Sequence, residues 1–252
     1  MPVSKSWRDV EPHVLVLTVD GALGPWRGHA SFAMAEDSLM AMTTEQFDEM
    51  PMVAYSDARP QLRTGDILLF NSANREAELI EFGTTSLWSH AAFVWRLTDV
   101  DRVMLLESMD PVGVRMMPMS TRVDGCAAGV PYQGKLLVLR HREFPDPPAP
   151  TKLRLMTQFA LDRVGFPYSL SELSQIEQRI ILGMAGKIIM GRPTQENQFL
   201  CAEYVAKCFE VMGIRLAPDR EGFIAPADIA NDANVNGLFS LCPGKPHLER
   251  IN

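Results

Sequence analysis

The hydrophobic pattern of this chain changes from strand-like to helix-like at a proline-rich segment, residues 145–150 (PDPPAP). Proline has no backbone N–H group, so such a segment interrupts strand pairing and forms a stiff link. Before it, short apolar stretches alternate with turn-forming residues, which is typical of strands. The predicted strands are 67–70, 90–97, 103–109, 113–119 and 135–142. Their short links favour an antiparallel meander over parallel crossovers.

After the proline-rich segment, apolar residues recur at intervals of three and four, which is the period of an α-helix. Three helices are predicted, over residues 153–164, 171–191 and 198–212. Strands followed by helices indicate an α+β fold, in which helices pack on one side of an antiparallel sheet. We therefore divide the chain into an N-terminal elaboration of unknown role, residues 1–60, and one domain over residues 61–252.

Charge and hydropathy exclude several function classes. The chain carries 24 Lys and Arg against 31 Asp and Glu, a formal charge of −7. An acidic chain lacks the basic field that grips phosphate backbones, so we expect no nucleic-acid partner. No apolar stretch is long enough to span a membrane. The apolar run at residues 14–19 is short for a signal-peptide core and is closed by Asp20, so we expect a cytoplasmic protein.

Among the four cysteines (126, 201, 208 and 242), Cys201 has the position that best suits chemistry. It lies in the first turn of the third predicted helix, where unpaired N–H groups and the helix dipole favour a thiolate. The same N–H groups could hold an oxyanion. The alternative is a small buried residue on the apolar stripe of that helix, which is the ordinary place for a free cysteine.

His90 and Glu107 are the groups that could assist such a thiol. His90 opens the strand 90–97, where two small alanines follow it and leave room for another element; a purely structural histidine is the alternative. Glu107 lies among apolar residues of the strand 103–109, so its carboxylate needs a partner. A hairpin centred near residue 100 would place Glu107 near Phe93 and about three positions from His90. A thiol, an imidazole and a carboxylate supply the nucleophile, base and orienting group of covalent catalysis.

Metal and cofactor sites are not expected. The histidines, at positions 13, 29, 90, 141 and 247, are scattered, without HxH or HExxH spacing and without Cys/His pairing at ligand spacing. Cys126 and Cys242 lie in predicted turns without a base at recognisable spacing. Cys208 lies two turns beyond Cys201 along the helix and is predicted to pack.

Four short motifs follow one another along the chain: RTGDIL at 63–68, SHAAFV at 89–94, LLES at 105–108 and LCAEYV at 200–205. Their succession resembles the circularly permuted branch of the NlpC/P60 papain-like cysteine hydrolases, in particular the YiiX/YebB-like group. In that branch the histidine strand and the acidic strand precede the cysteine helix. The resemblance extends over about residues 62–240, and the order and spacing of the motifs make it specific.

The resemblance implies a papain-like fold in which Cys201 is the nucleophile, His90 the general base and Glu107 the residue that orients the base. It also matches Tyr168 to a tyrosine near the cysteine whose hydroxyl helps to bind the substrate carbonyl; simple aromatic packing is the alternative. The chain departs from the family in having Ala202 where Ser or Asn is more frequent, and in lacking the export signal of familiar bacterial members.

The function predicted from these features is a thiol hydrolase that cleaves an amide or ester bond through an acyl-enzyme. Two alternatives stay open, namely a lipid or amine acyltransferase that uses the same thiol, and a non-catalytic binding module. The expected substrate is a small peptide or a lipid-like molecule. An Ile- and Met-rich segment, residues 175–192, is interpreted as a core helix, with an acyl-pocket wall or a membrane-surface contact as alternatives. The sequence does not predict an oligomeric state.

Overall fold

The computed structural model describes residues 44–71, 86–125, 130–169, 199–216 and 224–243. All of them lie within one of the two compact units of the chain, residues 39–252. Three features discussed above fall outside the described residues: the apolar run at 14–19, the helix predicted over 171–191 (with the segment 175–192), and Cys126.

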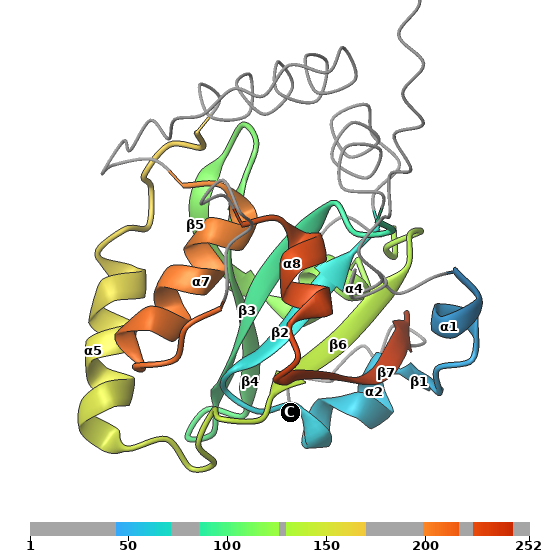
Figure 1. Cartoon of the computed structure of the whole chain (residues 1–252), viewed down its shortest axis with the longest axis horizontal. Coiled ribbons are helices and arrows are strands. Elements are labelled where there is room, and N and C mark those ends of the chain that lie inside the picture. Colours follow the sequence, from blue (N-terminus) through green and yellow to red (C-terminus); the bar gives the residue numbers. More distant parts are fainter. Residues whose placement is uncertain (1–43, 72–85, 126–129, 170–198, 217–223, 244–252) are drawn as a thin grey trace, which may run out of the picture. The chain divides into compact units, whose positions relative to one another are not determined.

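Seven strands of the described residues form one sheet, in the order β1-β7-β6-β2-β3-β4-β5 (Figure 1). The strands are β1 (Met52–Ala54), β2 (Asp66–Phe70), β3 (His90–Leu97), β4 (Arg102–Met109), β5 (Gly113–Pro118), β6 (Leu136–His141) and β7 (Val235–Cys242). The β1–β7 pair is parallel, whereas the other neighbouring strands are antiparallel. The sheet is therefore mixed, and its antiparallel part contains all the predicted strands.

The helices of the described residues are α1 (Thr44–Asp48), α2 (Tyr55–Ala58), the 3₁₀ helix η1 (Arg59–Gln61), α4 (Met119–Val123), α5 (Pro150–Leu161), α7 (Cys201–Val211) and α8 (Pro226–Asn231). The longest of these, α5 and α7, correspond to two predicted helices. Helix α5 begins at Pro150, a position where the missing N–H group costs no helical hydrogen bond. The predicted α+β class is confirmed.

The predicted strands correspond to β2 through β6, but the meander is wrong at its last member. Strand β6 pairs with β2, on the far side of β2 from β3, and not with β5. The connection from β5 to β6 contains α4 and is long enough to cross the sheet, and β6 covers an edge of β2 that would otherwise be unpaired. Strand β7 was not predicted, because Gly237 interrupts the apolar alternation of its sequence (VNGLFSLC).

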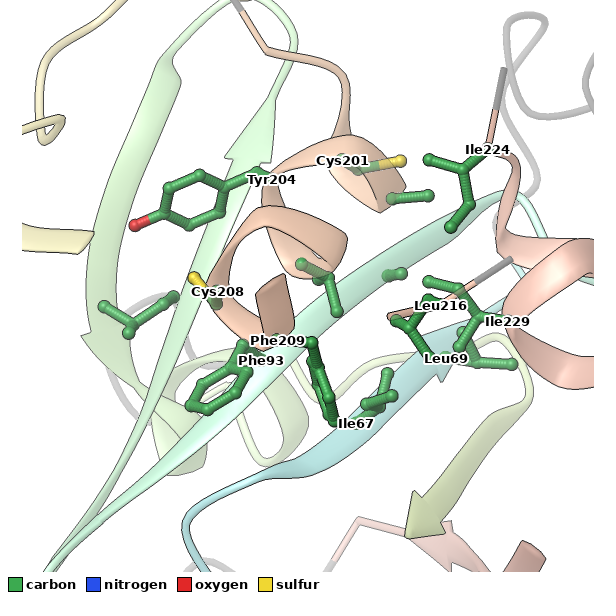
Figure 2. Packing of buried hydrophobic residues seen from close by; sticks show 14 of the residues in the cluster. Ile67, Leu69, Phe93, Cys201, Tyr204, Cys208, Phe209, Leu216, Ile224 and Ile229 are labelled. Atoms are coloured by element: carbon green, nitrogen blue, oxygen red, sulfur yellow. The ribbon is translucent and has the colours of Figure 1, made fainter. Parts of the chain in front are cut away.

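The sheet separates two apolar clusters. On one face, alternate residues of β2 and β3, such as Ile67 and Phe93, pack with α7 residues, among them Phe209 (Figure 2). On the other face, Phe70 and Val94 pack with apolar residues of α2 and α4. The long helices thus lie on one face, as predicted, and the short helices α2 and α4 contribute to the other. Strands β3 and β4 are buried on both faces, so polar groups within them have dry surroundings.

Candidate active site

Cys201 is the first residue of α7, as the motif predicts. The preceding residue, Leu200, has an extended backbone and no polar side chain with which to cap the helix. Cys201 is 4% exposed, whereas Cys208 is fully buried. Figure 2 shows the sulfur of Cys201 at the start of α7 and that of Cys208 farther along the helix. Burial raises the pKa of the Cys208 thiol, which makes this second cysteine inert.

The register of the β3–β4 hairpin places Glu107 on the same face as His90. Phe93 pairs with Leu106, and the loop between the strands is residues 98–101. The predicted pairing of Glu107 with Phe93 is therefore wrong by one residue, because the loop is centred half a position earlier than assumed. A shift of one residue moves every side chain to the other face of the sheet. In the observed register, His90 is a diagonal neighbour of Glu107, within reach of a long side chain.

The buried carboxylate of Glu107 has partners for both oxygens. Its Oε2 lies 2.7 Å from Nε2 of His90. Its Oε1 accepts hydrogen bonds from Nε (2.8 Å) and Nη2 (2.6 Å) of Arg115. Burial alone would raise the pKa of this carboxyl, but the hydrogen bond with His90 and the charges of His90, Arg115 and Arg122 lower the pKa to about 2. Glu107 is therefore ionised at neutral pH.

The ring of His90 contacts Glu107, and the side chain of Cys201 also acts on its pKa. Burial alone would lower its pKa, but hydrogen bonds with Cys201 and Glu107, together with the charges of both, raise the pKa to about 9. Because Nε2 is bonded to Glu107, Nδ1 is the ring nitrogen left for the sulfur. The ring also packs against Phe70, with 5.2 Å between ring centroids. The structure thus brings together three of the four predicted site residues.

Tyr168, the fourth predicted residue, lies beside the segment that leads into α7. It forms an isolated parallel bridge with Phe199, two residues before Cys201, and is 8% exposed. This pairing places the backbone of Tyr168 next to the approach to the cysteine. The role of its hydroxyl in binding a carbonyl oxygen stays a prediction.

Two arginines of the site were missed by sequence reasoning. Arg115 lies directly opposite Glu107 in the β4–β5 pair. Arg122, in α4, stacks its guanidinium over the rings of Phe70 and Tyr132 at 5.1 and 5.3 Å from their centroids. A buried glutamate needs a cation as its partner, and only the register of β5 against β4 shows that this cation is Arg115.

We expect the His90 ring to titrate near pH 9, far above its ordinary value of 6.5. With a folded pKa above the unfolded one, the protonated ring contributes stability that is fully present below about pH 6.5 and is lost as the pH rises through about 9. Histidine resonances in NMR spectra recorded against pH measure this midpoint directly. Glu107→Gln is expected to lower the midpoint, because the amide carries no negative charge.

His141 serves as an internal control for this titration. It is buried at the end of β6, and burial lowers its pKa below 6.5. The two buried histidines should therefore titrate on opposite sides of the ordinary value. A His90 midpoint at or below 6.5 would contradict the proposed hydrogen bonding of the ring.

Comparison with known proteins supports the fold. No family model matches the chain, and no curated protein matches it. Its structure is similar to the crystal structure of the metalloprotein yiiX from Escherichia coli O157:H7, with a TM-score of 0.52 over 73% of this chain and 99% of that chain. This chain has a yiiX-like fold. At 16% sequence identity the likeness concerns the fold alone, and the arrangement is consistent with a papain-like α+β fold.

The described residues lack two further features. No helix among them is long and apolar enough to cross a membrane. Within the same residues, His, Cys, Asp and Glu side chains form no group of three or more that could hold a metal ion.

Proposed function

We propose that this chain is a thiol hydrolase of the permuted NlpC/P60 type, which cleaves an amide or ester bond through an acyl-enzyme. Cys201 is the nucleophile, His90 the general base and acid, and Glu107 the residue that orients the ring. The observation that carries the proposal is the 2.7 Å contact of His90 with Glu107, together with the side chain of Cys201, which helps to raise the pKa of the ring. A nucleophile, a base and an orienting group in contact form the arrangement of covalent catalysis.

In the proposed reaction, the His90 ring, with a pKa of about 9, already holds the thiol proton on Nδ1 at neutral pH, and the sulfur of Cys201 attacks the substrate carbonyl carbon as a thiolate. A C–S bond forms, and the carbonyl oxygen becomes an oxyanion. As the carbonyl reforms, the bond to the leaving amine or alcohol breaks, and His90 gives its proton to that leaving group. A water molecule then attacks the thioester, His90 takes one of its protons, and cleavage of the C–S bond releases the carboxylic acid and returns the thiolate beside the protonated ring.

The start of α7 is the proposed oxyanion site. The first N–H groups of an α-helix have no partner within the helix, and the positive end of the helix dipole favours negative charge. Cys201 occupies the first position of this helix, so an oxyanion formed on its acyl group lies near these donors. We propose the hydroxyl of Tyr168 as a further donor, because its backbone pairs with the segment just before Cys201.

Glu107 and Arg115 are proposed to keep the imidazole in one orientation. The carboxylate stabilises the imidazolium that forms when His90 takes a proton, as the acidic member of a catalytic triad does. Arg115 holds the other carboxylate oxygen, so Glu107 cannot rotate without losing two hydrogen bonds. This set of contacts keeps the Nδ1 side of the ring toward the sulfur.

The metal that the name of yiiX ascribes to that protein does not fit the residues described here. Both carboxylate oxygens of Glu107 are already engaged, by His90 and by Arg115. Nε2 of His90 is engaged as well, which leaves Nδ1 and the sulfur of Cys201 as two donors, whereas protein zinc sites use at least three. No step of the proposed reaction uses a metal.

Substitution of Cys201 by alanine is expected to abolish turnover, because the thioester cannot form. The assay is release of chromophore from a panel of acyl esters and peptidyl anilides of increasing chain length, which also separates lipid-like from peptide substrates. Cys242→Ala is the matched control, because Cys242 is a free cysteine at the end of β7, and it should retain full turnover. Equal turnover by Cys201→Ala and the wild type would refute the proposal.

Analysis of the products separates hydrolysis from acyl transfer. Both reactions share the thioester on Cys201 and differ in the group that removes it. With an added amine or lipid alcohol, a hydrolase releases free acid, whereas an acyltransferase forms the amide or ester of the added acceptor.

A further inference from the structure

Strand β4 carries two adjacent polar residues, Glu107 and Ser108, that are both completely buried. Successive side chains of a strand point to opposite faces of the sheet. Glu107 reaches His90 on one face. Ser108 alternates with Glu107 and shares the face of Leu106, which belongs to the apolar cluster of α7. Ser108 therefore faces the helix that carries Cys201.

The hydroxyl of Ser108 binds the backbone that leads into this helix. Its Oγ donates a hydrogen bond of 2.7 Å to the carbonyl oxygen of Phe199, 91 positions away in the sequence. The N–H group of Ser169 donates a longer bond, 3.4 Å, to the same oxygen. Phe199 lies two residues before Cys201, and only Leu200 separates them. Ser108 is therefore the closer of two donors that hold the entry to α7.

We propose that Ser108 is a positioning residue for Cys201, an inference that rests on the proposed function. The side chains of Glu107 and Ser108 leave neighbouring positions of one strand, so the distance between the groups that they hold is set by a rigid backbone. Glu107 holds the imidazole, and Ser108 holds the chain two residues from the thiol. Strand β4 thus positions both the imidazole of His90 and the segment that leads to Cys201. Displacement of reacting groups by about 1 Å can cost about 100-fold in rate.

The first test is the reactivity of Cys201 toward iodoacetamide in Ser108 variants. Ser108→Ala removes the donor to Phe199 and is expected to lower the alkylation rate constant about tenfold, within the range that small displacements produce. The same variant should lower the titration midpoint of His90, because the thiol contributes to that midpoint. Ser108→Thr keeps a hydroxyl and should retain the alkylation rate constant and the His90 midpoint of the wild type. Ser108→Val has nearly the shape of the Thr variant but no hydroxyl, so it should retain neither.

Ser240→Ala is the matched control. Ser240 is a buried serine of β7, and its Oγ donates a bond of 3.3 Å to the carbonyl oxygen of Pro51, before β1. The substitution removes the same kind of hydrogen bond from the same sheet, but β6 and β2 lie between β7 and the histidine strand. It should lower stability without changing the reactivity of Cys201 or the midpoint of His90.

The outcomes separate this inference from the proposed function. An unreactive Cys201 in the wild-type protein would contradict the function itself. A reactive wild type, with Ser108→Ala as reactive as Ser240→Ala and with an unchanged His90 midpoint, would overturn only the positioning role. If Ser108→Ala does not fold, the Thr and Val variants decide: equal reactivity of these two overturns the inference, and slower reaction of the Val variant supports it.

Discussion

Replacement of His90 by alanine is expected to slow the reaction of Cys201 with iodoacetamide at neutral pH by about 100-fold, the lower end of what a positioned base contributes. Glu107 holds the ring at Nε2, and interaction with the side chain of Cys201 helps to raise the pKa of the ring. Without it, the proton of the thiol has no acceptor, and the thiolate loses the cation that stabilises it. The rate constant is measured by mass spectrometry of the peptide that contains Cys201.

The control for this substitution is His141→Gln. His141 is also buried, but it lies at the end of β6 and accepts a hydrogen bond from the backbone N–H of Glu143. A glutamine can accept a similar bond, so the variant should keep the wild-type rate at Cys201. Equal slowing in both variants would indicate a general loss of structure. An unchanged rate in His90→Ala would exclude His90 as the base.

Replacement of Arg115 by alanine is expected to cost about 3 kcal/mol of folding free energy, the lower end for breaking a buried ion pair because the arginine is partly exposed. Glu107 is completely buried, and Arg115 donates two hydrogen bonds to one of its oxygens. Without Arg115 the carboxylate stays desolvated with less compensation. Urea denaturation at neutral pH measures the loss.

The matched control is Lys207→Ala, which removes an exposed ion pair with Glu210 on α7. Such surface pairs contribute about 0.5 kcal/mol or less. The pH dependence gives a further check: protonation of Glu107 removes the uncompensated charge, so the loss in Arg115→Ala should shrink as the pH falls. An equal loss in the Arg115 and Lys207 variants would contradict the assignment of Arg115 as the partner of the buried carboxylate.

The parts of the fold that follow from local pattern were predicted correctly. Strands β2 to β6 are short apolar stretches between turn signals, and α7 has a regular apolar stripe, so each is visible in its own sequence. The position of β6 beside β2 depends instead on how the chain crosses the sheet after α4, and β7 lacks a regular alternation. These two features are set by the assembled sheet, which no single window of sequence contains.

The candidate site was proposed from residue types and the family resemblance, and its supporting contacts were not predicted. Cys201, His90 and Glu107 follow from the chemistry that their positions favour and from the family resemblance. The face of Glu107 depends on whether the hairpin loop is centred at residue 100 or half a position earlier, and the sequence does not specify this. The role of Arg115 follows from the register of β4 and β5, and that of Ser108 from a contact across 91 positions of the sequence. Neither residue was predicted.

The central claim is that Cys201 is the reactive thiol of this chain, and the order in which its cysteines are alkylated tests the claim most directly. Substoichiometric iodoacetamide, followed by peptide mapping, measures that order. The account predicts that Cys201 is labelled first, although it is only 4% exposed, and that Cys208, fully buried with a raised pKa, is labelled last. Labelling of Cys242 or Cys126 before Cys201 would contradict it.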